Sequence, residues 1–239
     1  MLEKEKFRTI ENVFDQATLR TLFKLSSQGY FDELLSPVSV GKESNIFSAR
    51  KGKEYVAVKI YRVNACDFKR MYSYIAGDPR FTGLQHQRRK VIDLWAQREF
   101  TNLHVARKAG CRVPAPHAVA KNVLVMEFMG EGAQASPKLK DKTPEDLKSF
   151  YKELFTNLKK LLKAKLIHGD LSEYNILNHN EKPILIDLSH GTILRHPNAA
   201  NLLKRDINVL TTYFIKKGLK LKPEEEYKKL TKQWNSTTN

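Results

Sequence analysis

The chain has 239 residues, 41% of them apolar, so it can bury the core of one large domain or two small lobes and is not disordered throughout. Its 42 basic and 26 acidic residues give a formal net charge of +16, which favours a polyanionic partner or simply keeps a basic protein in solution. The sequence has no apolar run of roughly 18 residues, no signal-peptide pattern at residues 1–7 and only two cysteines, Cys66 and Cys111, so we expect a cytoplasmic protein without membrane contact or disulfides.

The N-terminal part is expected to be helical from Phe14 to about Leu35, because its leucines recur at near-helical spacing. Gly29 should interrupt this segment and divide it into two short helices, which end at Ser36-Pro37. Packing of these helices on the core is favoured over contact with a partner.

Residues 38–49 predict a strand, a turn at Gly41 and a second strand. Backbone N–H groups of such a turn, together with Lys42, Glu43 and Ser44, can hold phosphate groups. A single glycine is equally typical of an ordinary hairpin turn, so both interpretations stay open.

Residues 54–61 predict a strand whose alternation places Ala57 and Lys59 on the same face. The small Ala57 would leave room for an adenine ring, while the ammonium group of Lys59 would reach the α- and β-phosphates. The alternative is an ordinary strand lysine on a solvated face.

The segment from Arg62 to His86 is polar and contains glycine and proline, so we expect a long mobile loop. Its hydroxyl side chains, Ser73 and Thr82, are candidates for self-phosphorylation.

A long helix is predicted from about Gln87 to Ala109, and Glu99 lies in the middle of its apolar stripe. Because an unpaired buried carboxylate is costly, we predict that Glu99 pairs with Lys59. In the alternative, Glu99 lies at the edge of the stripe and pairs with a nearby base such as Arg98 or Lys108.

An apolar strand follows at residues 122–130 and ends at a glycine. In a two-lobed nucleotide-binding fold, the backbone of Glu127 and Met129 would pair with the adenine edge, and Met126 would border the pocket. From the sequence alone this is also an ordinary buried strand.

The main break in composition is a connector rich in Gly, Ser, Pro and Lys at residues 131–142. We therefore predict a helical extension over residues 1–36, an N-lobe over residues 37–130 and a C-lobe over residues 131–239. The C-lobe should open with a capping box at Thr143-Pro-Glu-Asp146, followed by a helix.

The pattern most specific for chemistry is the polar loop at residues 167–177, which places Asp170 and Asn175 five positions apart between apolar flanks. A carboxylate that meets an acceptor hydroxyl and an amide oxygen that binds Mg²⁺ suit phosphoryl transfer. Asp187 follows a short apolar strand and could supply a second metal ligand. A polar turn is the alternative for any isolated Asp and Asn at this spacing.

The sequences at residues 40–47, 57–62, 168–177 and 186–189 together resemble the RIO family of atypical protein kinases, in particular its first subfamily. The resemblance covers roughly residues 12–215. It implies an α+β, trimmed bilobal protein-kinase-like fold with a small N-terminal helical extension. It also implies a serine/threonine kinase or ATPase capable of autophosphorylation, which binds ATP and Mg²⁺ or Mn²⁺ and acts on precursors of the small ribosomal subunit and their RNA, with no DNA partner.

The resemblance gives each site residue a role. Lys59 would contact the phosphates, Asp170 would be catalytic, and Asn175 and Asp187 would bind the metal. Asp187 is also our candidate acceptor of the γ-phosphoryl group, because the resemblance implies an aspartyl-phosphate intermediate.

Two other classes of function share some of these features. A small-molecule phosphotransferase of the aminoglycoside or choline kinase type shares the His-Gly-Asp-Leu sequence at residues 168–171 but would need a longer acceptor-binding lobe. An inactive RNA-binding scaffold would fit the charge, but the complete set of Lys59, Glu99, Asp170, Asn175 and Asp187 argues against it.

Overall fold

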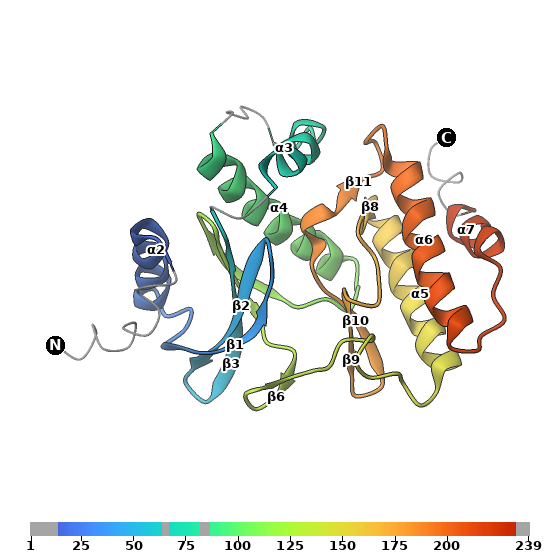
Figure 1. Cartoon of the computed structure of the whole chain (residues 1–239), viewed down its shortest axis with the longest axis horizontal. Helices are drawn as coiled ribbons and strands as arrows, with labels where there is room; N and C mark the ends of the chain where they lie inside the picture. The colour runs from blue at the N-terminus through green and yellow to red at the C-terminus, as the bar shows by residue number, and fades with distance from the viewer. Residues whose placement is uncertain (1–13, 64–66, 82–86, 233–239) are drawn as a thin grey trace. The chain divides into compact units, whose positions relative to one another are not determined.

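The computed structural model describes residues 14–63, 67–81 and 87–232 of the chain (Figure 1). The fold divides into two compact units. Unit 1 consists of residues 1–100 and 115–135, and unit 2 consists of residues 101–114 and 136–239.

Unit 1 is built on an antiparallel five-stranded sheet with the strand order β1-β2-β3-β5-β4. The strands are β1 (Glu33–Val40), β2 (Ser44–Lys51), β3 (Glu54–Tyr61), β4 (Pro116–Ala120) and β5 (Val123–Glu127). A short hairpin, β6 (Gly130–Glu131) and β7 (Gln134–Ala135), follows the sheet. The predicted strand at residues 54–61 is thus confirmed, and it lies at the centre of the sheet.

Helix α2 (Gln16–Ser27) packs on one face of the sheet. Its N-cap is Asp15, whose carboxylate accepts from the Thr18 N–H at 3.0 Å. Leu22 and Leu25 of α2 join the apolar cluster of the sheet, and the β3 members of that cluster are Val56, Val58 and Ile60. The prediction that the N-terminal helix packs on the core is therefore confirmed.

Helix α4 (Arg88–Lys108) contacts the other face of β3. Its Glu99 forms an ion pair with Lys59, which points away from the face that bears Val56, Val58 and Ile60. Helix α3 (Phe68–Ala76) shares an apolar cluster with α4. That cluster contains Tyr61, Met71, Ile75, Val91, Ile92, Trp95 and Ala96. As predicted, the apolar stripe of α4 is buried, and Gly110 follows the helix with a φ of +76°.

Two predictions for unit 1 are wrong. The helix expected after Gly29 is instead the start of β1, because Gly29 with a φ of +77° ends α2 and the chain then pairs with β2. Pro37 lies inside β1 at a shift of register, a position that an edge strand tolerates. The loop expected from Arg62 to His86 contains α3, and its predicted phosphorylation site Thr82 lies outside the described residues.

Unit 2 contains α5 (Leu147–Lys163), α6 (Ala199–Lys216) and α7 (Pro223–Thr231). Two short antiparallel pairs accompany the helices: β9 (Ile176–His179) with β10 (Lys182–Leu185), and β8 (Leu166–Ile167) with β11 (Thr192–Ile193). A single 3₁₀ turn, η1 (Leu188–His190), follows β10.

The start of α5 differs from the predicted capping box. The N-cap is Asp146, which accepts from the Ser149 N–H at 2.8 Å, whereas Thr143 lies outside the helix. Helix α7 begins at Pro223, which three glutamates follow, a pattern that suits the first turn of a helix.

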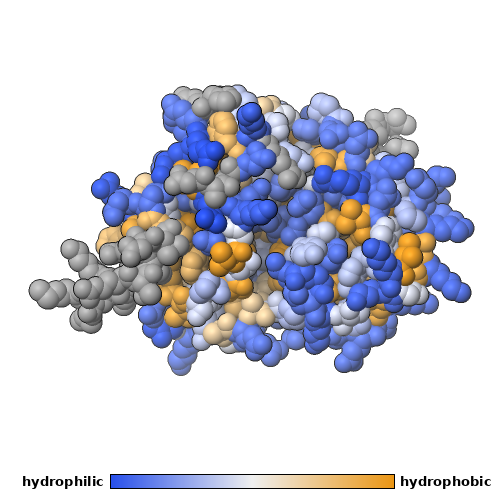
Figure 2. Space-filling model, viewed as in Figure 1, coloured by the Kyte–Doolittle hydropathy of each residue, from blue (hydrophilic) through white to orange (hydrophobic). Residues whose placement is uncertain are grey.

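The surface in Figure 2 is mainly hydrophilic, with hydrophobic residues in separate small patches. Among the described residues, no helix combines the length and the apolar character needed to cross a membrane.

Candidate active site

The turn between β1 and β2 carries the predicted phosphate-binding residues. The Gly41 N–H donates to the Ser44 carbonyl at 2.9 Å, and the Glu43 carbonyl accepts from the Arg62 N–H at 2.9 Å. A Cβ atom on Gly41 would lie 3.0 Å from the Ser44 oxygen, which favours glycine here. Lys42 is exposed at the tip. The turn is a tight hairpin, and phosphate binding by Gly41, Lys42, Glu43 and Ser44 stays a prediction.

Lys59 and Glu99 form a buried ion pair, as predicted from the strand alternation and the helix stripe. The Lys59 Nζ lies 3.0 Å from Glu99 Oε1 and 2.9 Å from Oε2, and both residues are at most 2% exposed. The alternative partner Arg98 pairs with Asp78 instead. Tyr61 is an unpredicted member of this site: its hydroxyl donates to Glu99 Oε2, and its ring centroid lies 5.1 Å from Lys59 Nζ.

The residues expected to border adenine lie together in the sheet, because the register places Ala57 of β3 opposite Met126 of β5. The Glu127 N–H donates to the Ala115 carbonyl at 2.8 Å, and the Glu127 carboxylate accepts from the Ala115 N–H at 2.9 Å. An adenine contact at Glu127 would therefore use its carbonyl. The role of Met129 stays a prediction.

In unit 2, Asp206 of α6 holds the loop after β8 through hydrogen bonds to its backbone. The Asp206 carboxylate accepts from the Gly169 N–H at 2.7 Å and from the Leu171 N–H at 3.1 Å, the two residues that flank Asp170. Burial raises the pKa of Asp206, while His168 and the two N–H groups act in the opposite direction. The backbone around Asp170 is therefore fixed by a buried acid that was not among the predicted site residues.

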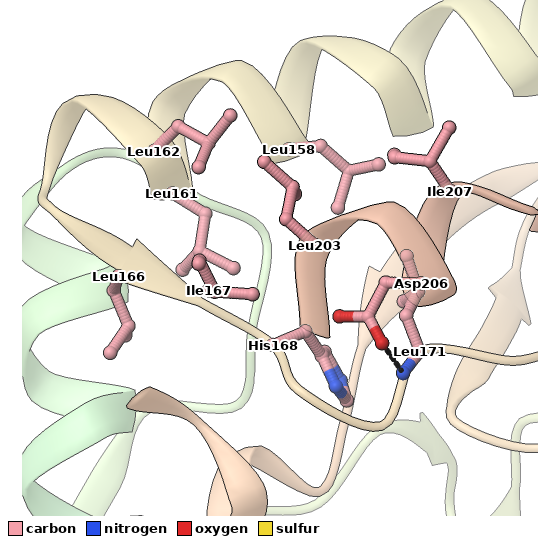
Figure 3. A pocket seen from close by; sticks show the side chains of 10 residues that line it. All are labelled: Leu158, Leu161, Leu162, Leu166, Ile167, His168, Leu171, Leu203, Asp206 and Ile207. Carbon is pink, nitrogen blue, oxygen red and sulfur yellow. Dashed lines mark hydrogen bonds between the residues drawn. The ribbon is translucent and has the colours of Figure 1, made fainter. Parts of the chain in front are cut away.

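Figure 3 shows Asp206 and His168 side by side at a small, mainly apolar cavity beneath this loop. A His168 Nε2 contact with the Ile186 carbonyl, 3.0 Å long, joins the loop to the segment that precedes Asp187. Gly169 has a φ of +77°, and a Cβ atom there would lie 2.5 Å from the His190 carbonyl. Only glycine fits this position without displacement of the backbone.

The predicted acid and metal ligands of unit 2 lie at the same end of the β9–β10 hairpin. The Asn175 amide nitrogen donates to the Asp170 carbonyl at 2.8 Å and to Asp170 Oδ2 at 3.3 Å, which ties Asn175 to Asp170. The Ile186 N–H donates to the Asn175 carbonyl at 3.0 Å, which places the next residue, Asp187, beside Asn175. All three side chains are only partly buried.

Asp187 has a strained backbone, with a φ of +58°. Such conformations in residues other than glycine concentrate at functional sites. The Ser189 hydroxyl donates to Asp187 Oδ1 at 2.7 Å and orients the carboxylate. The turn behind it is held by Asn102, fully buried, whose amide donates to the Leu188 and Gly191 carbonyls at 2.8 Å each.

A metal ion would find few side-chain ligands in either unit. Among the described residues, no group of three or more His, Cys, Asp and Glu side chains could hold a metal. Mg²⁺ usually binds one or two protein oxygens and completes its shell with phosphates and water. The carboxylate of Asp187 and the amide oxygen of Asn175 are hard oxygen ligands of that kind.

Known proteins are similar to this chain over most of its length. The family model for the RIO domain matches residues 45–228. The chain is 43% identical to a protein from Methanocaldococcus jannaschii named RIO-type serine/threonine-protein kinase Rio1, over 97% of this chain and 81% of that protein. A protein of the same name from Haloferax volcanii is 40% identical over 90% of this chain and 75% of its own length.

The fold also matches a solved structure, that of the Rio2 kinase from Chaetomium thermophilum, with a TM-score of 0.70 at 25% identity. The match covers 88% of this chain but only 66% of the solved chain. The predicted α+β kinase-like fold is thus confirmed, and the names of the relatives agree with the predicted first subfamily.

Proposed function

The chain belongs to the RIO domain family of atypical kinases, and from this premise we propose that it is a Mg²⁺-dependent serine/threonine kinase or ATPase that binds ATP. We further propose that it phosphorylates itself and acts in the maturation of the small ribosomal subunit. The observation that carries the proposal is the ordered set of Asp170, Asn175 and Asp187 at one end of a hairpin.

Each residue has a step that follows from its surroundings. Lys59, held by Glu99, would bind the α- and β-phosphates, and Asn175 and Asp187 would hold Mg²⁺, which would neutralise charge on the transferred group. Asp170 would orient or deprotonate the attacking hydroxyl or water. The Arg205 guanidinium lies 4.0 Å from Asp170 Oδ1.

The first experiment measures γ-phosphate release and transfer from labelled ATP with Mg²⁺, and then with Mn²⁺. Asp170→Asn and Asp187→Asn should lower turnover by at least about a hundredfold, because each removes a charge that acts at the reacting group. Asp141→Asn is the matched control in unit 2, since Asp141 is an exposed acid paired with its neighbour Lys140. Full activity in Asp170→Asn would contradict the proposal.

We propose that Asp187 can also accept the phosphoryl group. A carboxylate oxygen would attack the γ-phosphorus, the bond to the β–γ bridging oxygen would break with release of ADP, and water would then hydrolyse the acyl phosphate to carboxylate and phosphate. Hydroxylamine should trap this acyl phosphate at Asp187, and mass spectrometry would locate it. Acid-stable phosphoserine alone would return Asp187 to the role of metal ligand.

Self-phosphorylation can be mapped in the same samples. Ser73 is exposed on α3 and remains a candidate acceptor, as does Thr82. Phosphate found only at other residues would contradict this assignment.

The ribosomal partner is proposed from the family resemblance and from the net charge of +16. Affinity for small-subunit precursor particles or structured RNA should fall steeply with salt, because each neutralised phosphate releases counterions. An affinity that is unchanged between 50 and 200 mM salt, roughly the range in which such contacts weaken, would exclude this use of the charge.

A further inference from the structure

A line of buried polar residues runs from α2 to the Lys59–Glu99 pair through Thr18, Asn122 and Tyr61. All five side chains are at most 2% exposed. Buried polar groups are costly unless they are hydrogen-bonded, and networks that are satisfied fix a single arrangement of the core. This line therefore holds the ion pair in one geometry.

The line begins at α2. The Thr18 hydroxyl accepts from the Asn122 amide at 3.0 Å, across the turn that joins β4 to β5. Asp15, which caps α2 through Thr18, also pairs with Arg89 of α4 at 3.1 Å. The helix on one face of the sheet is thus bonded both to the end of the sheet and to the helix that carries Glu99.

Asn122 fixes the end of β3 with two hydrogen bonds. Its side-chain amide donates to the Tyr61 carbonyl at 2.8 Å, and its carbonyl accepts from the Tyr61 N–H at 2.9 Å. The same amide reaches Thr18. The backbone of Tyr61 therefore has little freedom, and its ring leaves the strand in a defined direction.

Tyr61 then holds the acid. Its hydroxyl donates to Glu99 Oε2, while Lys59 donates to Oε1 at 3.0 Å. Lys59 also lies 2.9 Å from Oε2, so the two donors together engage both oxygens and restrict rotation of the carboxylate. The ring face of Tyr61 also lies against the Lys59 ammonium group, at 5.1 Å.

We infer that Tyr61 is a positioning residue for the Lys59–Glu99 pair and that Thr18 of α2 sets its position through Asn122. This inference rests on the proposed role of Lys59 in phosphate binding. According to this inference, helix α2 contributes to nucleotide binding as well as packing on the sheet. The competing explanation is that these bonds contribute stability alone.

The test compares the affinities of the full chain for ATP with Mg²⁺ and for adenosine, which lacks phosphates. Tyr61→Phe keeps the ring and removes only the hydroxyl bonded to Glu99. We expect ATP to bind about tenfold more weakly, since a hydrogen bond to a charged group is lost, and adenosine to bind as before. A general loss of structure in unit 1 would weaken the binding of both ATP and adenosine, and that result would overturn the inference.

A double-mutant cycle tests whether the effect passes through Glu99. In a Glu99→Gln background, Tyr61→Phe should cause little further loss of ATP affinity. Losses that simply add would overturn the inference.

The role of α2 is tested by a matched pair of threonines. Thr18→Val should weaken ATP binding about threefold, which corresponds to part of one neutral hydrogen bond. Thr21→Val is the control, because Thr21 lies on the same helix, is also buried, and bonds to the Ala17 carbonyl of its own helix at 2.9 Å. Equal effects of the two changes on ATP affinity would show that α2 acts through stability alone.

Lys59→Ala separates this inference from the proposed function. If Lys59→Ala weakens ATP binding but Tyr61→Phe does not, the positioning role of Tyr61 is wrong and phosphate binding by Lys59 stands. If Lys59→Ala leaves ATP affinity unchanged, the proposed function of Lys59 fails, and the inference fails with it.

Discussion

The ion pair between Asp78 and Arg98 should be strongly asymmetric in its effect on stability. Arg98 is fully buried, and within the described residues none of its three guanidinium nitrogens has a hydrogen-bond partner; its Nε lies 3.5 Å from Asp78. Asp78, in contrast, accepts two hydrogen bonds from the Arg80 side chain, at 2.9 and 2.6 Å. Burial lowers the pKa of Arg98 to about 10 despite the attraction of Asp78.

Asp78→Asn would leave a buried cation without its counter-ion, which typically costs about 3–5 kcal/mol. Arg98→Met should change the free energy of unfolding by no more than about 1 kcal/mol, because Asp78 keeps Arg80 and an apolar chain replaces a poorly bonded cation. The double variant should recover most of the loss. Glu33→Gln is the control, since its pair with Arg50 is partly exposed and worth little.

Urea unfolding monitored by tryptophan fluorescence measures these differences, with Trp95 next to the Arg98 guanidinium at 5.3 Å. Burial tends to raise the pKa of Asp78, but the hydrogen bonds and charge of Arg80 lower it overall. A lowered pKa stabilises the fold above the ordinary value of 3.8, and this contribution is lost as pH falls through the folded value. A loss below about 1 kcal/mol for Asp78→Asn at pH 7, or no recovery in the double variant, would refute this reasoning.

Three further outcomes follow from the described contacts. Gly169→Ala should lower the free energy of urea unfolding by roughly 1–3 kcal/mol, because the added methyl group meets the His190 carbonyl in a left-handed backbone; an unchanged midpoint would contradict this. Asn102→Ala should lower kcat at least about tenfold by releasing the turn behind Asp187, and unchanged kcat would exclude that role. In a Cys66→Ser variant, Cys111 should react slowly with thiol reagents at pH 8, because burial raises its pKa to about 11; rapid labelling of the folded protein would disagree.

The sequence predicts those site residues whose pattern is local. Asp170 and Asn175 are five positions apart in one loop, and the Lys59–Glu99 pair follows from a strand alternation and an acid on an apolar stripe. Asp206 was missed because it looks like an ordinary polar residue of an amphipathic helix. Its partners, Gly169 and Leu171, are backbone groups 37 and 35 residues away, and backbone donors leave no mark in the sequence.

The wrong predictions of secondary structure have a similar origin. Helix α3 was called a loop because glycine, proline and charge dominate the segment around it, although Phe68, Met71 and Ile75 recur at helical spacing. Residues Leu34 and Leu35 suit a helix or a strand equally, and pairing with β2 decides between the two. Tertiary pairing overrides propensity in such short apolar runs.

Helix α4 carries two adjacent buried charges, Arg98 and Glu99, that differ in their contacts. Arg98 and Glu99 are neighbours on the helix, both fully buried and both paired with a distant residue of opposite charge. The sequence singles out Glu99, because it lies in the middle of the apolar stripe. The contacts separate the two residues further: Glu99 holds Lys59 and Tyr61 with both oxygens, whereas Arg98 makes no hydrogen bond among the described residues. An apolar replacement of Arg98 should therefore be tolerated. An apolar replacement of Glu99 should abolish the proposed phosphate binding by Lys59, because an apolar side chain cannot hold the Lys59 ammonium group in place.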